Sequence, residues 1–298
     1  MKIKNITVVT CTRDRSAQLK QTLSHVKNIN NLKEHLIIDW NSESNLKLNN
    51  NEKEKTSIYK VLNENRWWLT RAYNTGFFVA ETEYILKLDA DVKINYKKFN
   101  NLDYTKYDII VFFDSPNDPG NFLIKKEILN KINGFNEYMW EWGWSDHDLI
   151  LRAKNLTNNI KFLDAYGYID KIEHDNSSRS IVKKNQIYKN TEQFYYSLIK
   201  AHNDTNAFLS KEKLWSLDNK LNYKIKDNKI IVKHFFTIKD LNFYLKLKYK
   251  FNILMSFFKI YKKESRFEKR ILPFLLLLLP NNILFKFFSI QIYPKIIK

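Results

Sequence analysis

Short apolar stretches alternate with stretches of helical spacing over residues 3–174, and this alternation is the strongest constraint on the fold. Apolar residues recur at helical spacing in 16–29 and 69–82, and 146–155 is also predicted to be helical. Stretches rich in β-branched and aromatic residues lie between them, at 3–11, 35–39, 57–62, 84–89, 107–113 and 160–174. Strands that alternate with helices predict an α/β domain with a largely parallel central sheet.

The strand predicted at 84–89 leads into two carboxylates, Asp89 and Asp91. In an extended chain residues i and i+2 point the same way, so both side chains can present oxygens to one cation. Oxygen ligands suit Mg²⁺ or Mn²⁺. In parallel sheets, ligands bind beyond the carboxyl ends of the strands. An Asp-x-Asp pair is a weak signal by itself, because a solvated turn at the end of a strand has the same pattern.

Positive charge is concentrated in the last third of the chain. Residues 201–298 hold 20 Lys and Arg against 7 Asp and Glu, which is +13 of the formal net charge of +18. A basic surface can bind nucleic acid or anionic lipid. The apolar run at 271–280 is too short to span a bilayer, and it follows the cations Lys262, Lys263, Arg266, Lys269 and Arg270.

Long aliphatic stretches among these charges favour lipid over nucleic acid, so we predict peripheral membrane contact and no nucleic-acid partner. An ordinary core helix is the alternative for the apolar run. The polar stretch at 200–207 suggests a boundary between a domain at 1–200 and a basic region at 201–298. Truncation after about residue 200 or 210 is then expected to release the protein from membranes.

Cys11 is the only cysteine, which excludes an intrachain disulfide and a zinc site of the cysteine type. A reducing, cytosolic compartment fits this composition. The first residues contain lysines but no apolar stretch of the kind found in signal peptides. We therefore expect a cytoplasmic protein, peripheral at the inner face of the cell membrane.

Four segments in order resemble the GT-A nucleotide-sugar glycosyltransferases: "VVTCTRDR", "IIDWNS", "NENRWWLTRAYNTGFFVAETEYILKLDADV" and "NGFNEYMWEWGWSDHDLILR". Among these enzymes the chain is similar to glycosyltransferase family 2, with a C-terminal motif of galactosyltransferases and polypeptide N-acetylgalactosaminyltransferases. The resemblance covers roughly residues 5–180. It implies a Rossmann-like GT-A domain with a mostly parallel sheet, followed by the basic and partly helical C-terminal region.

The resemblance implies roles for particular residues on the donor side. The nucleotide-sugar would be bound by Thr10, Thr12, Arg13, Asp39, Arg71, Asn74 and Asp89. Arg71 can pair with the diphosphate or brace an aspartate. A divalent cation, Mn²⁺ or Mg²⁺, would be held by Asp89, Asp91 and His174. Lys87, two residues before Asp89, is expected to face the same crevice.

The tryptophan-rich segment implies the acceptor side. Asp146 corresponds to the general base of the family, while Ser145 replaces the acidic residue that the family has before it. Acceptor contacts are implied for Trp142, Gly143, Trp144 and Asp148. His147 is a second candidate base. Alternatively, Ser145 caps a helix whose first turn holds Asp146 and Asp148, which is compatible with catalysis.

The implied reaction is metal-dependent transfer of a hexose or N-acetylhexosamine from a UDP-sugar to a hydroxyl of a glycan acceptor, with inversion. The acceptor would be a surface polysaccharide or a lipid-linked glycan. Two other classes stay open. The same carboxylates can serve a metal-dependent nucleotidyltransferase or phosphohydrolase, although the chain has no P-loop. A membrane-tethered, catalytically weak or inactive sugar-nucleotide-binding protein is the other, since Ser145 departs from the family pattern.

Overall fold

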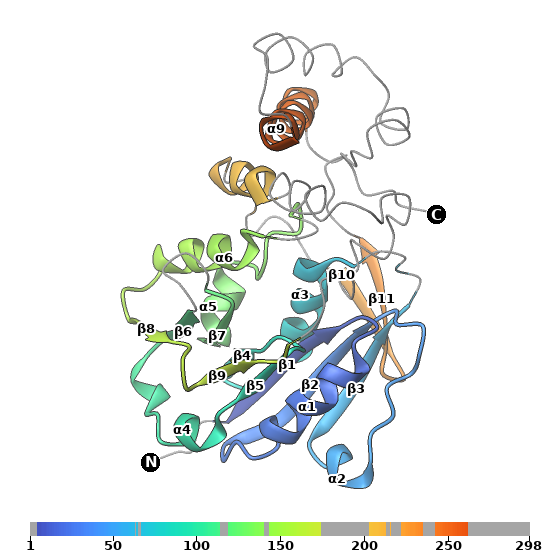
Figure 1. The fold of residues 1–298 in the computed structure, drawn as a ribbon, viewed down its shortest axis with the longest axis vertical. Coiled ribbons are helices and arrows are strands. Elements are labelled where there is room, and N and C mark those ends of the chain that lie inside the picture. Colours follow the sequence, from blue (N-terminus) through green and yellow to red (C-terminus); the bar gives the residue numbers. More distant parts are fainter. Residues whose placement is uncertain are drawn as a thin grey trace.

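A computed structural model of the chain describes residues 5–62, 64, 67–113, 119–139, 143–173, 203–212, 215, 222–234 and 242–261. Within these ranges the main sheet has nine strands in the order β10-β11-β3-β2-β1-β4-β7-β6-β8, and β5 pairs with β9 in a separate two-stranded sheet (Figure 1). The predicted α/β class with a mostly parallel central sheet is confirmed, because β1, β2, β3 and β4 are all parallel neighbours.

The element bounds follow the sequence pattern closely. The strands are β1 (Ile6–Thr12), β2 (Leu32–Trp40), β3 (Thr56–Val61), β4 (Tyr84–Lys87), β5 (Val92–Ile94), β6 (Ile109–Phe113), β7 (Asn121–Lys125), β8 (Ile160–Asp164), β9 (Ile169–Lys171), β10 (Asn222–Lys226) and β11 (Lys229–His234). The helices are α1 (Ser16–Val26), α2 (Asn50–Lys53), α3 (Leu69–Val79), α4 (Tyr96–Asn100), the 3-10 helix η1 (Tyr104–Lys106), α5 (Lys126–Lys131), α6 (Ser145–Lys154) and α9 (Phe243–Tyr261), and a further helix includes residues 203–211.

Helices cover both faces of the sheet, so the domain has three layers (Figure 1). On one face, α3, α5 and α6 pack on strand residues such as Val9 and Ile85. On the other face, α1 and α4 pack on residues of opposite parity, such as Val8 and Leu86. The two-residue period of buried apolar side chains in β1 and β4 therefore supplies two cores, one on each side of the sheet.

Two features of the sheet were not predicted from the sequence. Strand β7 lies antiparallel between β4 and β6 and interrupts the parallel order, which resumes with the parallel pairing of β6 and β8. At the other edge, the hairpin of β10 and β11 joins the sheet through parallel pairing of β11 with β3. The predicted division at residue 200 stays a prediction, but residues 222–234 form part of the same sheet as the N-terminal strands.

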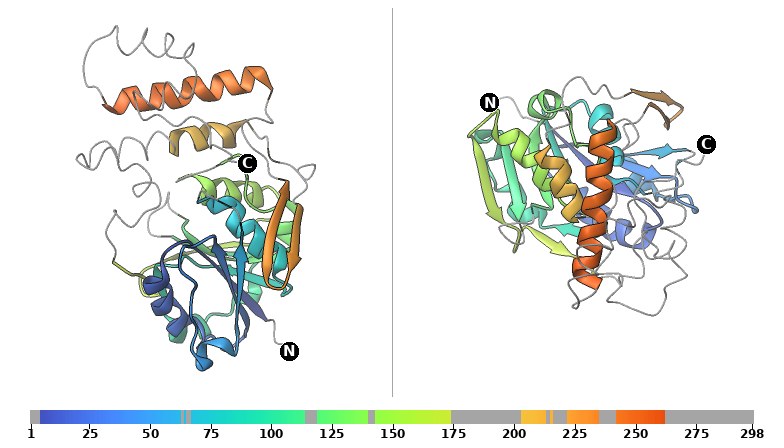
Figure 2. Two further views of the ribbon diagram at one scale, coloured as in Figure 1. Left: turned by 90° about the vertical axis from the view of Figure 1, so that its right-hand side faces the viewer. Right: turned by 90° about the horizontal axis from the view of Figure 1, so that it is seen from above.

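The C-terminal helices stack on the α6 side of the molecule. The helix that includes residues 203–211 lies between α6 and α9 in Figure 1 and in the left view of Figure 2. Tyr249 and Leu254 of α9 are fully buried, and Asn252 donates a hydrogen bond to Thr205 at 3.3 Å. No helix in the described part of the chain combines the length and the apolar character needed to cross a membrane. The apolar run at 271–280 lies outside the described residues.

Gly76 allows α3 to lie close to the sheet. A Cβ atom at this position would be 2.3 Å from Cγ1 of Val9 and 3.2 Å from Cγ1 of Ile38. Any side chain at residue 76 would therefore push α3 away from β1 and β2. Because α3 also carries Tyr73 toward the carboxyl ends of these strands, this close packing positions part of the site described below.

Gly76→Ala is expected to lower the free energy of unfolding by about 1–3 kcal/mol, because overpacking outweighs the higher helix propensity of alanine. Urea unfolding measures this. Val9→Ala is the second variant, and it tests the cause, because it removes Cγ1 of Val9, the atom that the Cβ of an alanine at residue 76 would meet. In the Val9→Ala background Gly76→Ala should cost clearly less than in the wild type. Strictly additive costs would show that the contact with Val9 does not explain why residue 76 is glycine.

Candidate active site

The carboxyl ends of β1 and β4 open into a pocket of about 590 Å³. Its walls come from the segment after β1, the first turns of α3, the end of β4, the segment before β7 and the start of α6. The residues that line the pocket include Thr12, Arg13, Arg15, Tyr73, Lys87, Asp89, Asp91, Asn121, Gly143, Trp144, Asp146, His147, Lys171 and Asn203. Parallel neighbours end at the same edge of a sheet, which explains why segments far apart in sequence meet here.

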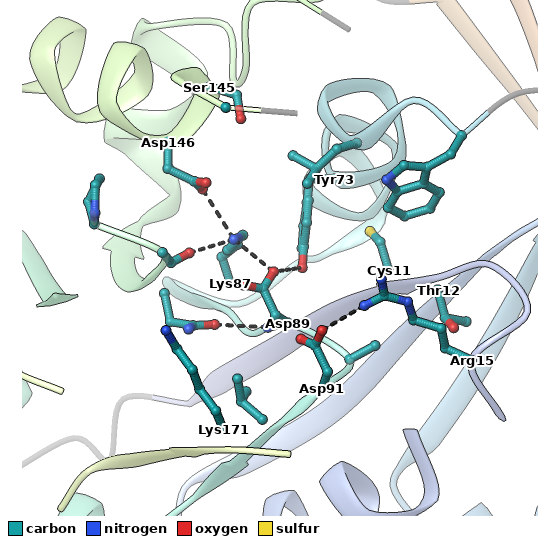
Figure 3. A pocket seen from close by; sticks show the side chains of 18 of the residues that line it. Cys11, Thr12, Arg15, Tyr73, Lys87, Asp89, Asp91, Ser145, Asp146 and Lys171 are labelled. Carbon is teal, nitrogen blue, oxygen red and sulfur yellow. Dashed lines mark hydrogen bonds and ion pairs between the residues drawn. The ribbon is translucent and has the colours of Figure 1, made fainter. Parts of the chain in front are cut away.

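Lys87 is the last residue of β4, and its buried ammonium group lies at the back of the pocket. Its Nζ lies 2.9 Å from Oδ1 of Asp89 and 3.2 Å from Oδ1 of Asp146, and it also donates to the carbonyl of Gly120 (Figure 3). Burial alone would lower the pKa of Lys87, but the nearby carboxylates of Asp146 and Asp89 outweigh burial and raise this pKa. The ammonium group therefore stays charged between two carboxylates.

Asp89 is held from two further directions. The hydroxyl of Tyr73 donates to its Oδ1 at 2.9 Å, and its backbone N–H donates to Oδ1 of Asn121 at 2.8 Å. Burial raises the pKa of Tyr73, and the charge of Asp89 raises it further, so the phenol keeps its proton. The side chain of Asp89 nevertheless remains one third exposed to the pocket, with 32% of its surface accessible.

Asp91 lies near Asp89 on the pocket wall and contacts a different cation. Arg15, the residue before α1, donates to Oδ2 of Asp91 at 2.6 Å (Figure 3). The backbone carbonyl of Asp91 accepts from the N–H of Ile172, which ties the segment to the end of β9. A hard divalent cation takes some of its oxygen ligands from water and substrate phosphates, so two carboxylates on one wall fit such an ion.

The chemistry of the donor set thus fits Mg²⁺ or Mn²⁺ at Asp89 and Asp91. Arg15 would share Asp91 with the cation or turn toward a phosphate. Within the described ranges, no group of three or more His, Cys, Asp or Glu is arranged to hold a metal ion. His174, the predicted third ligand, lies outside those ranges.

Asp146 lies in the first turn of α6, and its side chain is 21% exposed. The helix begins at Ser145, and the residue before it is Trp144 in the left-handed conformation with φ of 64°. Ser145 is therefore the first residue of the helix rather than its cap, which corrects the alternative interpretation of this segment. The left-handed turn at Trp144 brings the start of α6 to the pocket, and Ser145, Asp146 and His147 all line it.

Trp144 and His147 form an aromatic pair beside Asp146, with ring centroids 4.5 Å apart. Burial lowers the pKa of His147, and the charge of Lys154 lowers it further, so the imidazole is neutral at neutral pH. Within the described residues, the indole N–H of Trp144 is buried and has no hydrogen-bond partner. A ligand in the pocket can accept from this donor.

Gly143 contacts the C-terminal region of the chain. Its φ is +96°, and a Cβ atom here would be 2.3 Å from Oδ1 of Asn203. The side chain of Asn206, which is almost fully buried, donates to the carbonyl of Gly143 at 2.8 Å. The backbone at Gly143 therefore lies close to the helix that includes residues 203–211, and Asn203 itself lines the pocket, while the acceptor contact predicted for Gly143 stays a prediction.

Arg71 and Asn74, predicted to bind the nucleotide, do not line the pocket. Arg71 is 1% exposed, lies over the ring of Trp68 and pairs with Glu137 at 3.6 Å. Asn74 exchanges hydrogen bonds with the backbone of Phe135 and also donates to Glu137. Both residues therefore brace the segment that leads to the tryptophan-rich loop, and the acidic partner of Arg71 is a glutamate rather than the aspartate considered from the sequence.

Three other predicted residues also have their polar groups engaged away from the pocket walls. The hydroxyl of Thr10 contacts the ring of His35 at 2.9 Å. Oδ1 of Asp39 accepts from the N–H of Ser42 in the turn after β2. The carboxylate of Asp148 pairs with Arg152 one turn later in α6. The geometry gives these side chains structural roles, and it does not bring them together with Asp89.

Thr12 and Arg13 do line the pocket, on the side of β1. In the described part of the chain, the buried hydroxyl of Thr12 has no hydrogen-bond partner. Arg13 donates to the carbonyl of Glu64 at 3.2 Å. Trp142, predicted as an acceptor contact, lies outside the described residues.

Sequence reasoning missed several residues of the pocket. Arg15, Tyr73, Asn121, Lys171 and Asn203 were not singled out. The "TRDRS" segment offered a signal for Arg15, because two arginines follow the first strand. No local signal marks Asn121 or Asn203, since each reaches the pocket only through long-range packing.

Comparison with known proteins gives two sequence matches. Residues 7–102 match the family model described as glycosyl transferase family 2, and residues 118–175 match the one described as the N-terminal domain of galactosyltransferase. No curated protein matches the chain. The predicted resemblance to family 2 with a galactosyltransferase-type motif is therefore confirmed.

Solved structures also align with this chain. Residues 1–349 of TarS from S. aureus in complex with UDP-GlcNAc align with a TM-score of 0.51 and 14% identity, covering 87% of this chain and 82% of that chain. Drosophila β1,4-galactosyltransferase 7 in complex with manganese, UDP-Gal and xylobiose aligns with a TM-score of 0.49 and 14% identity, covering 76% and 92%. At this identity the likeness to TarS shows the GT-A fold.

Gly143→Ala is expected to lower the free energy of unfolding more than Gly167→Ala does. Both glycines have positive φ, 96° and 77°, so each substitution carries a strain of about 1 kcal/mol. Only at Gly143 does the new Cβ also displace Asn203, whereas at Gly167 it would meet the flexible end of Lys98 at 3.0 Å. Equal losses in urea unfolding would contradict the packing of the 203–211 helix on this loop.

Proposed function

We propose that this chain, a glycosyltransferase of the GT-A fold, moves a hexose or N-acetylhexosamine from a UDP-sugar to a hydroxyl group of a glycan acceptor. The observation that carries the proposal is the presence of Asp89, Asp91 and Asp146 on the walls of one pocket. Its volume of about 590 Å³ suits a small-molecule ligand. The complex of TarS with UDP-GlcNAc supports the choice of a UDP-sugar.

The donor is proposed to lie along the β1 side of the pocket. Thr12 and Arg13 would contact the nucleoside, and Arg15 and Lys171 offer positive charge near the two aspartates. Asp89 and Asp91 would hold Mn²⁺ or Mg²⁺, which neutralises the diphosphate and stabilises the charge on the departing UDP. Thr10 and Asp39 would support this wall from the core through the contacts described above.

Asp146 is proposed to act as the general base. Its carboxylate accepts the proton of the acceptor hydroxyl while that oxygen forms a bond to the anomeric carbon. The bond from this carbon to the diphosphate oxygen breaks, and UDP leaves with the electron pair. A base that lies across the pocket from the leaving group favours a single displacement, so the product would have inverted configuration. NMR of the product's anomeric proton tests this, because retention would exclude the mechanism.

The acceptor is proposed to enter beside Gly143 and Trp144, near Asp146. The indole of Trp144 offers an apolar face and an unpartnered N–H, both of which suit a sugar ring. Trp142 is also proposed for this subsite. His147 is the other candidate base, because its neutral imidazole lies in the same wall. Asp148 is proposed to help indirectly, by fixing the start of α6 through Arg152.

The first test is UDP release from a panel of UDP-sugars, namely UDP-Gal, UDP-Glc, UDP-GalNAc and UDP-GlcNAc, with Mn²⁺ and with chelator. Release from one donor that requires the metal is expected. Asp91→Asn should lower it by about 100-fold, and Asp146→Asn should lower transfer by about 100- to 10,000-fold while UDP still binds. Asp103→Asn, an exposed aspartate outside the pocket, is the matched control and should leave both rates unchanged.

Two outcomes would contradict the proposal. Binding of UDP without its release from any donor, in the presence of candidate glycan acceptors, would identify a sugar-nucleotide-binding protein. This is the principal alternative, because Ser145 replaces the acidic residue of the family. Release that is identical with chelator and in Asp91→Asn would remove the divalent cation from the mechanism. Isothermal titration with UDP distinguishes loss of binding from loss of chemistry.

The acceptor is proposed to be a surface polysaccharide or a lipid-linked glycan at the inner face of the cell membrane. Helix α9 supports this location, because Phe243, Tyr244 and Leu247 are 79%, 67% and 42% exposed. The helix contains Lys246, Lys248 and Lys250 and no acidic residue. Exposed aromatic side chains among lysines fit the surface of an anionic bilayer.

Tyr244→Glu is expected to weaken binding to vesicles that contain phosphatidylglycerol by about tenfold, because it replaces an exposed ring that would enter the bilayer surface with a negative charge. Tyr166→Glu is the matched control, since Tyr166 is 87% exposed in the turn between β8 and β9. Vesicle flotation with the full chain is preferable to truncation, because residues 222–234 belong to the central sheet. Equal binding of the two variants would contradict a membrane role for α9.

A further inference from the structure

Lys87 is the meeting point of three segments that are distant in sequence. It ends β4, it reaches the carbonyl of Gly120 just before β7, and it contacts Asp146 at the start of α6. Its side chain is 1% exposed, whereas the side chains of Asp89 and Asp146 are 32% and 21% exposed. The ammonium group therefore lies behind the two carboxylates, on their side away from solvent (Figure 3).

Lys87 contacts one carboxylate oxygen, Oδ1, on each of its two acidic partners, Asp89 and Asp146. Nζ lies 2.9 Å from Oδ1 of Asp89 and 3.2 Å from Oδ1 of Asp146. A carboxylate that is held by one oxygen has its plane and direction restricted. One buried cation thus orients two carboxylates that have been assigned to different tasks, one for the donor and one for the acceptor.

Without a cation between them, two carboxylates that converge on one point would repel each other and turn apart into solvent. The ring of Tyr73, whose centroid is 4.9 Å from Nζ, and the carbonyl of Gly120 complete the surroundings of the ammonium group. Since these partners come from different elements, the position of Nζ is fixed by the packing of the domain. Lys87 is therefore a rigid reference point for both aspartates.

We propose that Lys87 is a positioning residue for sugar transfer, because it holds Asp146 toward the acceptor hydroxyl and Asp89 toward the donor at a fixed separation. This inference rests on the proposed function. A positioning role of Lys87 differs from a purely structural role in a measurable way. Loss of positioning affects the rate of transfer from the bound state, whereas loss of stability alone changes the melting temperature and leaves kcat of the folded fraction unaltered.

The test is Lys87→Met, which keeps the length of the side chain and removes the charge. We expect kcat for transfer to fall by about 100-fold, as for a small misplacement of reacting groups, with a change in the Kd of UDP of less than about fivefold. Lys125→Met is the matched control. Lys125, which lies on the neighbouring strand β7, forms an ion pair with Asp108 at 2.6 Å. Neither Lys125 nor Asp108 lines the pocket.

A double-mutant cycle gives the second readout. In the Asp146→Asn background the general base is already lost, so Lys87→Met should lower the remaining rate by a clearly smaller factor than in the wild type, because only the positioning of Asp89 is then still affected. Equal fold losses in both backgrounds would overturn the proposal, as would a kcat for Lys87→Met within threefold of the wild type. If circular dichroism shows that Lys87→Met is unfolded, Lys87→Gln is measured by the same criteria.

The two proposals fail in different ways. A wild-type protein that transfers no sugar from any UDP-sugar overturns the proposed function, and the inference about Lys87 with it. A wild-type protein that is active beside an equally active Lys87→Met overturns only the inference. An equal fall in kcat for Lys125→Met and Lys87→Met also overturns the inference. The fall in kcat would then follow from the loss of any ion pair in the sheet.

Discussion

The structure depends on a charged group that is buried where the parallel strands end. Lys87 is covered by α3, by the segment before β7 and by α6, and its charge is balanced by Asp146 of α6 and by Asp89, which follows β4. A buried ammonium group without such partners would be strongly unfavourable. The requirement to balance it therefore links the docking of α6 to the end of β4. The packing of the domain and the shape of its pocket thus have one electrostatic cause.

Much of the fold and part of the site could be predicted from local patterns. The strands and the helices of the first 173 residues follow the apolar periodicity, and Asp89, Asp91 and Asp146 share one pocket, as their motifs indicated. Strand β7 was not predicted at all, because only three consecutive apolar residues, Phe122 to Ile124, mark it in the sequence. Arg71 and Asn74 carried a motif for the nucleotide, but their partner is Glu137, which no local pattern connects to α3.

The C-terminal region contributes to the site through contacts that the family matches do not cover. Those matches end at residue 175, while Asn203 lines the pocket and Asn206 holds the carbonyl of Gly143. Composition pointed only to a basic, apolar region, because polar side chains such as these are unremarkable in sequence. Elements beyond the shared domain are a common source of specificity when a scaffold serves many substrates. Here they reach the part of the pocket beside Gly143 and Trp144, which is the proposed acceptor side.

The edge of the sheet at β3 has a consequence for how the protein is made. Its hydrogen-bonding partner is β11, and on the order of 170 residues separate the two strands, so at ~5–20 residues per second the ribosome needs ~10–30 s to deliver that partner. During this interval β3 is an open strand on an otherwise complete N-terminal sheet, and such edges can pair with other chains. The hairpin covers the end of β3 at Lys60 and Val61 only after it has been synthesised, and a chain that stalls before residue 229 would lack this cover.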